Sequence, residues 1–148
     1  MYYFNLNPGS LIAIKITMST IRTFKDIRAW EKAVELAKWV YQYSGTYPFS
    51  KDKVFQIQIR KAALSIASNI AEGFEREGNK EFIHFLSVAK GSAAETQTQL
   101  LIAYEVGYIT SEELKQLDEL CIEVICLIAG FMKYLRTSKL ESQKFNRK

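Results

Sequence analysis

The chain has 148 residues, which is enough for one domain with a sizeable core and too few for several domains. Apolar residues make up 48% and charged residues 24% of the sequence, as in an ordinary globular protein and unlike a disordered chain. The net charge of +4 and the isoelectric point near 9.0 permit contact with nucleic acid but do not require it.

The N-terminal segment, residues 1–22, does not follow a helical pattern. Ile12, Ile14 and Ile16 alternate with other residues, as in a strand or an extended arm. We expect a non-helical arm that packs on the body of the protein or on a neighbouring subunit. Met18 is an alternative starting residue, which would make the preceding segment an upstream extension.

Features of membrane and secreted proteins are missing from the sequence. No apolar run approaches the length of a membrane span. The N-terminus lacks the basic region of a signal peptide, and Lys15 interrupts its apolar run at residues 11–16. Cys121 and Cys126 lie about 140° apart around one predicted helix, so they cannot pair with each other and are read as buried free thiols. We therefore predict a cytoplasmic protein with no membrane partner.

A first helix is predicted over residues 26–43, where apolar side chains recur every three or four positions. Thr23 and Asp26 have the spacing of a capping box at its start. Gly45 is a good C-terminal stop, and Ser50 is expected to cap the helix that follows.

The second predicted helix, residues 51–77, carries the most informative stretch of the chain. One of its faces is apolar and rich in alanine, so another helix can approach closely. Gly78 and Asn79 are predicted to end this helix and begin the next. The apolar face consists of Ile59, Ala63, Ile66, Ala67, Ile70 and Phe74.

Two further helices complete the pattern. The third is predicted over residues 80–106, with Gly107 as its stop. Thr110 and Glu113 form a capping box that opens the fourth, which runs to Leu135. Short connections between long helices make consecutive helices antiparallel neighbours. The predicted fold class is therefore all-α, an antiparallel up-down-up-down four-helix bundle over residues 23–136, with the N-terminal arm before it and a basic tail, residues 137–148, after it.

The sequence offers little support for catalysis. Glu81 and His84 have the Glu-x-x-His spacing of di-iron bundles, but those sites need two such motifs and this chain has one histidine. Glu72 and Glu75 have the spacing of a magnesium-binding pair, but no second acidic pair follows. Arg76 and His84 straddle a turn and do not share a helix as a helical ribonuclease would need. We expect no catalytic residues, no metal, no cofactor and no small-molecule substrate; the alternative is a metal-dependent hydrolase or nuclease on a helical bundle.

Four separated motifs carry a family resemblance. They are the runs at residues 24–30, 60–76, 80–95 and 106–108. Together they resemble the bacterial four-helix-bundle proteins that are encoded in intervening sequences of large-subunit ribosomal RNA genes and are often labelled ribosomal-protein-like. The resemblance covers residues 23–136, and its signature residues are assigned to structure: Arg60, Asn69, Glu72, Gly73, Gly91, Ser92 and Glu95.

The resemblance implies a self-associating protein without enzymatic activity. The family is similar in fold to the accessory variability protein of diversity-generating retroelements, a barrel-shaped homopentamer that binds a reverse transcriptase and nucleic acid. A homopentamer, with RNA, the ribosome or a reverse transcriptase as partner, is therefore an expectation. The sequence also contains an aromatic cluster, formed by Trp39, Tyr41, Tyr43 and Tyr47. Its surface is larger than the contact between the helices of one bundle buries, which favours self-association.

Basic side chains on the polar faces are the candidates for contact with nucleic acid, because phosphate groups bind lysine and arginine. They are Lys61, Arg76, Lys80, Lys133, Arg136 and the residues of the tail.

One pair of residues is predicted from the geometry of the hairpin between the second and third helices. Arg60 is 18 positions before Gly78 and Glu95 is 17 positions after it, so both lie at one level of the hairpin. A guanidinium directed into the bundle is costly unless it meets a carboxylate. We therefore predict a partly buried Arg60–Glu95 ion pair, beside a close contact of Ala62 and Ala63 with the small residues at 91–94.

Overall fold

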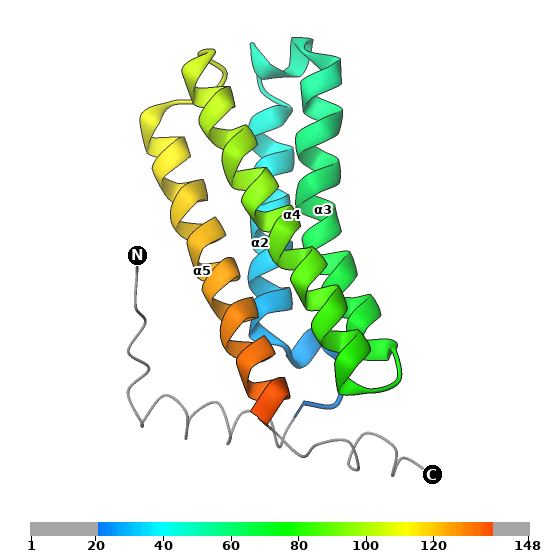
Figure 1. Cartoon of the computed structure of the whole chain (residues 1–148). Helices are drawn as coiled ribbons and strands as arrows, with labels where there is room; N and C mark the ends of the chain where they lie inside the picture. The colour runs from blue at the N-terminus through cyan, green and yellow to red at the C-terminus, as the bar shows by residue number, and fades with distance from the viewer. Residues whose placement is uncertain (1–20, 138–148) are drawn as a thin grey trace.

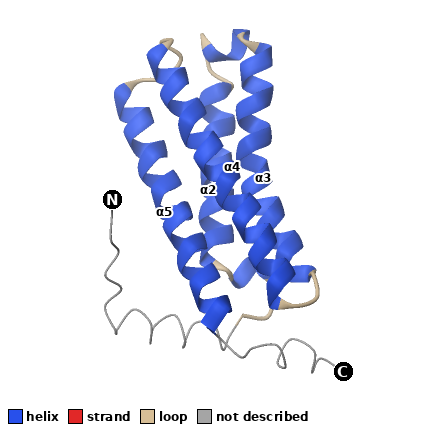
Figure 2. Cartoon of the chain, in the orientation of Figure 1, coloured by secondary structure: helices blue, strands red, loops and turns tan. Residues whose placement is uncertain are grey.

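The computed structural model describes residues 21–137 and shows an all-α protein (Figure 1). Within this range four long α-helices form an antiparallel bundle: α2 (Arg28–Ser44), α3 (Lys53–Glu75), α4 (Asn79–Glu105) and α5 (Ser111–Thr137). The described part of the chain contains helices and loops and no strand (Figure 2). The predicted four-helix bundle is confirmed. Most of the predicted arm and tail lies outside the described residues.

The start of the bundle differs slightly from the prediction. The Asp26 carboxylate accepts hydrogen bonds from the backbone N–H groups of Arg22 and Thr23, at 2.9 Å each. This capping box closes a short 3₁₀ turn, η1 (Phe24–Asp26), and α2 begins two residues after that turn. The predicted capping box of Thr23 and Asp26 therefore exists, but it belongs to the 3₁₀ turn that precedes the helix and not to the helix itself.

The connection between α2 and α3 contains a second 3₁₀ turn, η2 (Phe49–Lys51), and a cis peptide bond before Pro48. The expected cap Ser50 lies inside this turn. Asp52 caps α3 instead, and its carboxylate accepts a hydrogen bond of 3.0 Å from the backbone N–H of Phe55. The prediction of Ser50 as the cap is wrong because the 3₁₀ turn moves the helix start two residues along the chain.

The other two connections turn at the predicted glycines, but Asn79 is the first residue of α4 and its side chain does not cap the helix. Gly78 and Gly107 have φ angles of +88° and +80°, a region that L-residues with a side chain rarely adopt. The Tyr108 N–H donates to the Ala103 carbonyl, and the Gly107 N–H donates to the Tyr104 carbonyl, which is a Schellman ending of α4. At the start of α5, the side chain and backbone of Thr110 exchange hydrogen bonds with Glu113 as a capping box requires.

All four helices contribute to one core along the bundle axis. Its largest fully buried side chains include Leu36 from α2, Ile66 from α3 and Ile128 from α5. The Phe82 ring of α4 meets the Phe131 ring of α5 edge to face, with centroids 5.2 Å apart. α2 packs against both α3 and α5, so the bundle closes on itself.

Candidate functional site

The signature stretch of α3 meets α4 through a polar contact inside the helix pair. The hydroxyl groups of Ser65 and Ser92 are 3.0 Å apart. The Asn69 amide donates to the Ser65 carbonyl at 2.7 Å and to the Ser65 hydroxyl at 2.9 Å. The Thr96 hydroxyl donates to the Ser92 carbonyl one turn further along α4. These short side chains therefore bond one another within the bundle, and this arrangement fixes the register between α3 and α4.

Gly73 lies at a close contact between α3 and α4. A Cβ atom at this position would be 2.6 Å from the Phe85 Cβ and 2.8 Å from the Phe82 Cδ2. Real Cβ atoms do not approach other atoms so closely, so only glycine fits without a shift of α4. Gly91, another signature residue, is different: it is exposed, and no atom lies within 4 Å of the position that a Cβ atom would take there.

The small-residue contact between α3 and α4 is narrower than predicted. Ala62, Ala63, Ser92 and Ala93 are buried, whereas Gly91 and Ala94 are exposed. Ser65 and Ser92 meet at the height that counting positions from Gly78 predicts. Counting gives the height of a residue on the hairpin but not the face of the helix from which its side chain projects.

The predicted Arg60–Glu95 ion pair is wrong for the same reason. Arg60 turns toward α2, where its guanidinium donates to the Ser44 hydroxyl at 2.8 Å and to the Tyr41 carbonyl at 3.2 Å. It also lies over the Tyr41 ring, 4.4 Å from the centroid. Glu95 is exposed on α4 and accepts a hydrogen bond from Gln99. The Ser44 hydroxyl and the Tyr41 carbonyl, both near the C-terminus of α2, therefore take the place of the predicted carboxylate.

No metal-binding cluster is found in the described range: no group of three or more His, Cys, Asp or Glu side chains is arranged there to hold an ion. Glu81 and His84 are exposed near the turn between α3 and α4, and the His84 ring contacts the Phe85 ring at 5.7 Å. None of the described helices is both long and apolar enough to cross a membrane.

The two cysteines have free thiols in different surroundings. Cys121 is fully buried, as predicted, and burial raises the pKa of its thiol to about 12. A thiol with so high a pKa is a poor nucleophile at neutral pH, because the thiolate is the reactive form. Cys126 is only half-buried, which corrects the prediction that both are buried.

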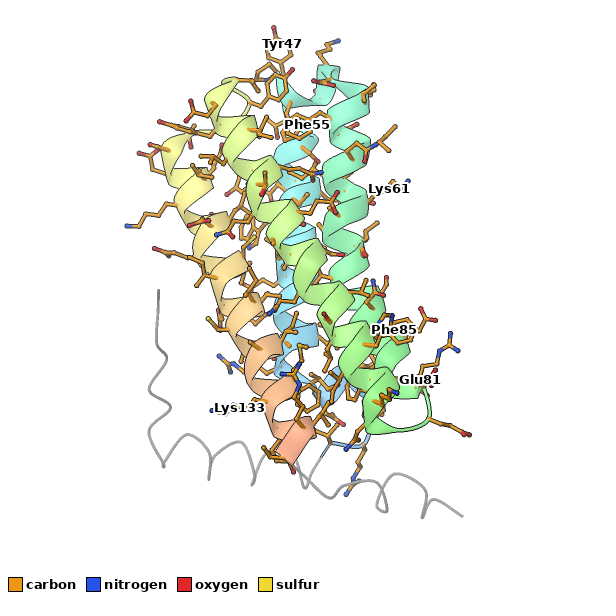
Figure 3. The ribbon with its side chains drawn as sticks, viewed as in Figure 1. Tyr47, Phe55, Lys61, Glu81, Phe85 and Lys133 are labelled. Atoms are coloured by element: carbon orange, nitrogen blue, oxygen red, sulfur yellow. The ribbon has the colours of Figure 1, made fainter. Side chains whose placement is uncertain are left out.

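The candidate basic residues do not form one site. Lys61 projects from the middle of α3, whereas Lys133 lies at the far end of α5 (Figure 3). Arg76 forms an ion pair of 2.6 Å with Glu72 and lies 5.4 Å from the Phe85 ring centroid. Lys80 is flanked in sequence by Glu77 and Glu81. Lys61 therefore lies apart from the others, Glu72 offsets the charge of Arg76, and Lys80 forms no ion pair with a described residue.

Lys133 and Arg136 lie in a different electrostatic setting. The last 14 residues of α5, from Val124 to Thr137, contain no acidic side chain. The α5 end lies at the same end of the bundle as the start of α2 (Figure 1), where Lys25 and Arg28 are also exposed. Arg28 pairs with Glu123 at 3.4 Å, and the other three form no ion pair with any described residue. The α3–α4 turn, with Glu77 and Glu81, lies at the same end, where the Asn79 amide donates to the Leu135 carbonyl at 3.5 Å. We call the group of four cations, Lys25, Arg28, Lys133 and Arg136, the basic end.

The charge of the chain is divided unevenly. Residues 21–137 contain 15 Lys and Arg and 15 Asp and Glu side chains, so the bundle itself is neutral. The net charge of +4 therefore lies entirely in residues 1–20 and 138–148. The second of these segments follows directly from the basic end and includes Lys139, Lys144, Arg147 and Lys148. Sequence reasoning identified the tail but missed Lys25 and Arg28, because only the fold brings them beside α5.

Exposed apolar side chains collect at the opposite end of the bundle. Seven of the eleven large hydrophobic residues that are exposed lie between the α2–α3 loop, the start of α3 and the end of α4. Val54 and Tyr47 are each 75% exposed, and Figure 3 shows Tyr47 at this extremity. We call these residues the apolar end: Tyr47, Val54, Ile57, Leu101, Ile102, Tyr104 and Val106.

The predicted aromatic cluster is divided by the fold. The rings of Trp39 and Tyr43 stack on each other with centroids 5.6 Å apart and are half-buried, whereas Tyr41 and Tyr47 are exposed. Tyr41 borders a groove between α2 and α3 with a volume of about 540 Å³. The lining of the groove is mostly apolar: Val34, Ala37, Lys38, Tyr41, Gln42, Leu64, Ala67 and Ser68.

The fold and these surfaces define a small antiparallel four-helix bundle with a basic end and an apolar end. The family model described as 23S rRNA-intervening sequence protein matches residues 25–130, and the chain belongs to this family. A solved structure from Bacteroides thetaiotaomicron VPI-5482, described as a protein with unknown function from the S23 ribosomal protein family, is 26% identical, with a TM-score of 0.66. The match covers 71% of this chain and 98% of that one. No curated protein matches the chain.

Proposed function

We propose that this protein is a non-enzymatic, self-associating bundle that binds structured RNA through its basic end and the basic tail that follows it. The observation that carries the proposal is the distribution of charge: a neutral bundle carries four exposed cations at the point where the basic tail begins. The family description, which refers to an intervening sequence of 23S rRNA, is consistent with an RNA partner.

Phosphate contacts require cations that are exposed and not already neutralised. Lys25, Lys133 and Arg136 are exposed and form no ion pair with a described residue, and the tail can add further cations at the same place. Such contacts release counterions from the RNA, so the affinity should fall as the salt concentration rises, by a slope of about 0.7–0.9 for each phosphate contact.

The first prediction concerns RNA binding by the basic end. Replacing Lys25, Lys133 and Arg136 together by Gln should weaken binding to a structured RNA and lower the slope of log Kd against log salt concentration by about 2. Fluorescence anisotropy titrations at several salt concentrations measure both quantities.

Two control variants keep this test specific. Lys51→Gln with Lys115→Gln removes two cations near the other end of the bundle and should leave the slope unchanged. Lys61→Gln tests the isolated candidate on α3, and it should also have little effect. Losses in proportion to the number of cations removed, three, two and one, would show that binding follows total charge and would contradict the proposal. The absence of binding even at low salt would contradict it as well.

Self-association is proposed to use the apolar end. Exposed apolar side chains gathered in one region are typical of protein–protein contacts, and a stable interface needs about 800 Å² from each partner. The pairing of Ser65 with Ser92 places Val54 at the level of Ala103, so the exposed side chains of α3 and α4 lie at one height of the bundle. A second copy of the chain is the proposed occupant, and five subunits is the number that the family resemblance implies.

The second prediction is that Ile57→Glu combined with Ile102→Glu converts the oligomer into a monomer, because a charge in an apolar contact costs its desolvation energy. Light scattering coupled to size exclusion at micromolar concentration measures the mass. Ile122→Glu, on α5 and outside the apolar end, is the matched control and should leave the mass unchanged. A monomeric parent chain would refute self-association without affecting the RNA measurement.

A further inference from the structure

The groove between α2 and α3 is an apolar feature that the proposed function does not use. Its floor is formed by Val34, Ala37 and Ala67, and its edges include Tyr41 and Leu64, which are 41% and 44% exposed. The groove therefore has two large apolar side chains open to solvent at its edges. The groove lies on the side of the bundle and is separate from the basic end.

The chain itself supplies a matching segment. Residues 11–16 read Leu-Ile-Ala-Ile-Lys-Ile, and they precede the described range by a few residues. In an extended segment Ile12, Ile14 and Ile16 point to one side, whereas Lys15 points to the other. One side is therefore wholly apolar and as narrow as a single row of side chains, which suits a groove between two helices.

The distances allow this segment to reach the groove of its own bundle. Ile21 packs against the core, and η1 contacts both α2 and α3, so the arm leaves the bundle where this helix pair begins. At 1.5 Å per residue, the groove extends from about 9 to about 21 Å beyond the start of α2. At 3.3 Å per residue, five extended residues place Ile16 about 16 Å from Ile21, and seven place Ile14 about 23 Å from it. Ile16 therefore falls at the height of the groove, and Ile14 reaches about 2 Å past its upper limit.

We propose that residues 11–16 lie in extended form along the α2–α3 groove of the same chain, with Ile14 and Ile16 against Leu64, Ala67 and Tyr41. Lys15 then faces solvent. The occupied groove buries the apolar side of a lone strand that has no sheet to join, and it covers the exposed parts of Tyr41 and Leu64 at the same time.

A double-mutant comparison tests the contact, and it is the third prediction. Ile14→Asp with Ile16→Asp, and separately Leu64→Asp, should each lower the Tm of the full chain by about 5 °C. Together they should lower it by little more than either alone, because both remove one shared contact. In a chain that begins at Met18, Leu64→Asp should have almost no effect. The matched controls are Lys15→Asp on the arm and Ile122→Asp, which is similarly exposed on α5; both should act independently. Additive losses from the arm and Leu64 would overturn the proposal.

Cross-linking determines which chain occupies the groove. Cys126→Ser leaves only the buried Cys121, and Ile16→Cys with Ala67→Cys then introduces a pair that can form a disulfide. We expect an intrachain disulfide that runs as a monomer in a non-reducing gel, whereas Lys15→Cys with Ala67→Cys should form none. A disulfide between chains would place the arm on a neighbouring subunit, and the absence of any disulfide would leave the groove to another occupant; either result would overturn the proposal.

Discussion

Gly73 shows how much can depend on one missing methyl group. A Cβ at this position would meet the Phe85 Cβ at 2.6 Å and the Phe82 ring at 2.8 Å, and Phe82 is fully buried. We predict that Gly73→Ala destabilises the protein by about 1–2 kcal/mol, because overpacking outweighs the better helix propensity of alanine. Chemical denaturation measures this change in the free energy of unfolding.

The same substitution should have the opposite effect at Gly91. That residue is also inside a helix, but no atom lies within 4 Å of the position of an added Cβ. Gly91→Ala should therefore stabilise the protein by up to about 1 kcal/mol through helix propensity alone. Equal effects at Gly73 and Gly91 would show that the close approach of α3 and α4 is not what requires glycine at position 73.

At the scale of the helices, the residues that end a helix contribute to stability, as do the side chains on its buried face. Gly107 ends α4 with a φ of +80° and no atom near its Cβ position, so its requirement for glycine is conformational. We predict that Gly107→Ala costs about 1–2 kcal/mol of stability, since the left-handed region is strained for residues with a side chain. Gly107→Asn should cost less, because asparagine tolerates that region better. Thermal unfolding of the two variants, side by side, tests whether backbone strain is the cause.

The C-terminus of α2 ends differently, through side chains of the next helix. Gln56 donates to the Ser44 carbonyl at 2.6 Å, and Arg60 donates to the Tyr41 carbonyl one turn earlier. Gln56 thus satisfies a carbonyl group at the end of α2, whereas Arg60 adds a second donor to the Tyr41 carbonyl, which also accepts the Gly45 backbone N–H at 3.1 Å. Arg60 therefore binds neutral groups at the negative end of the α2 dipole, where a cation is favoured.

The sequence predicts the bounds of the helices well, but it predicts poorly which side chains of neighbouring helices contact each other. Periodicity and the glycine stops place all four helices within about two residues of their observed bounds, because both signals are local. The partner of Arg60 could not be predicted in this way, because α3 packs against both α2 and α4. A helical-wheel projection shows that a side chain points into the bundle, but not which of the two neighbouring helices it meets. The basic end was missed for a related reason: Lys25 and Lys133 are 108 positions apart in sequence and share a surface only after the bundle closes.

At the scale of the whole molecule, the bundle has two unlike ends. One end carries exposed cations and leads into the basic tail, and the other carries exposed apolar side chains. An assembly held together through the apolar ends would present several basic ends at once. Several weak RNA contacts on one particle raise the overall affinity through effective concentration, without any new contact.

The neutrality of residues 21–137 has a consequence for the behaviour of the protein in solution. Molecules with no net charge do not repel one another, and they associate and precipitate most readily. The exposed apolar end would add to this tendency in the isolated bundle. The short terminal segments, which hold all of the excess positive charge, are therefore also what keeps concentrated molecules apart at neutral pH.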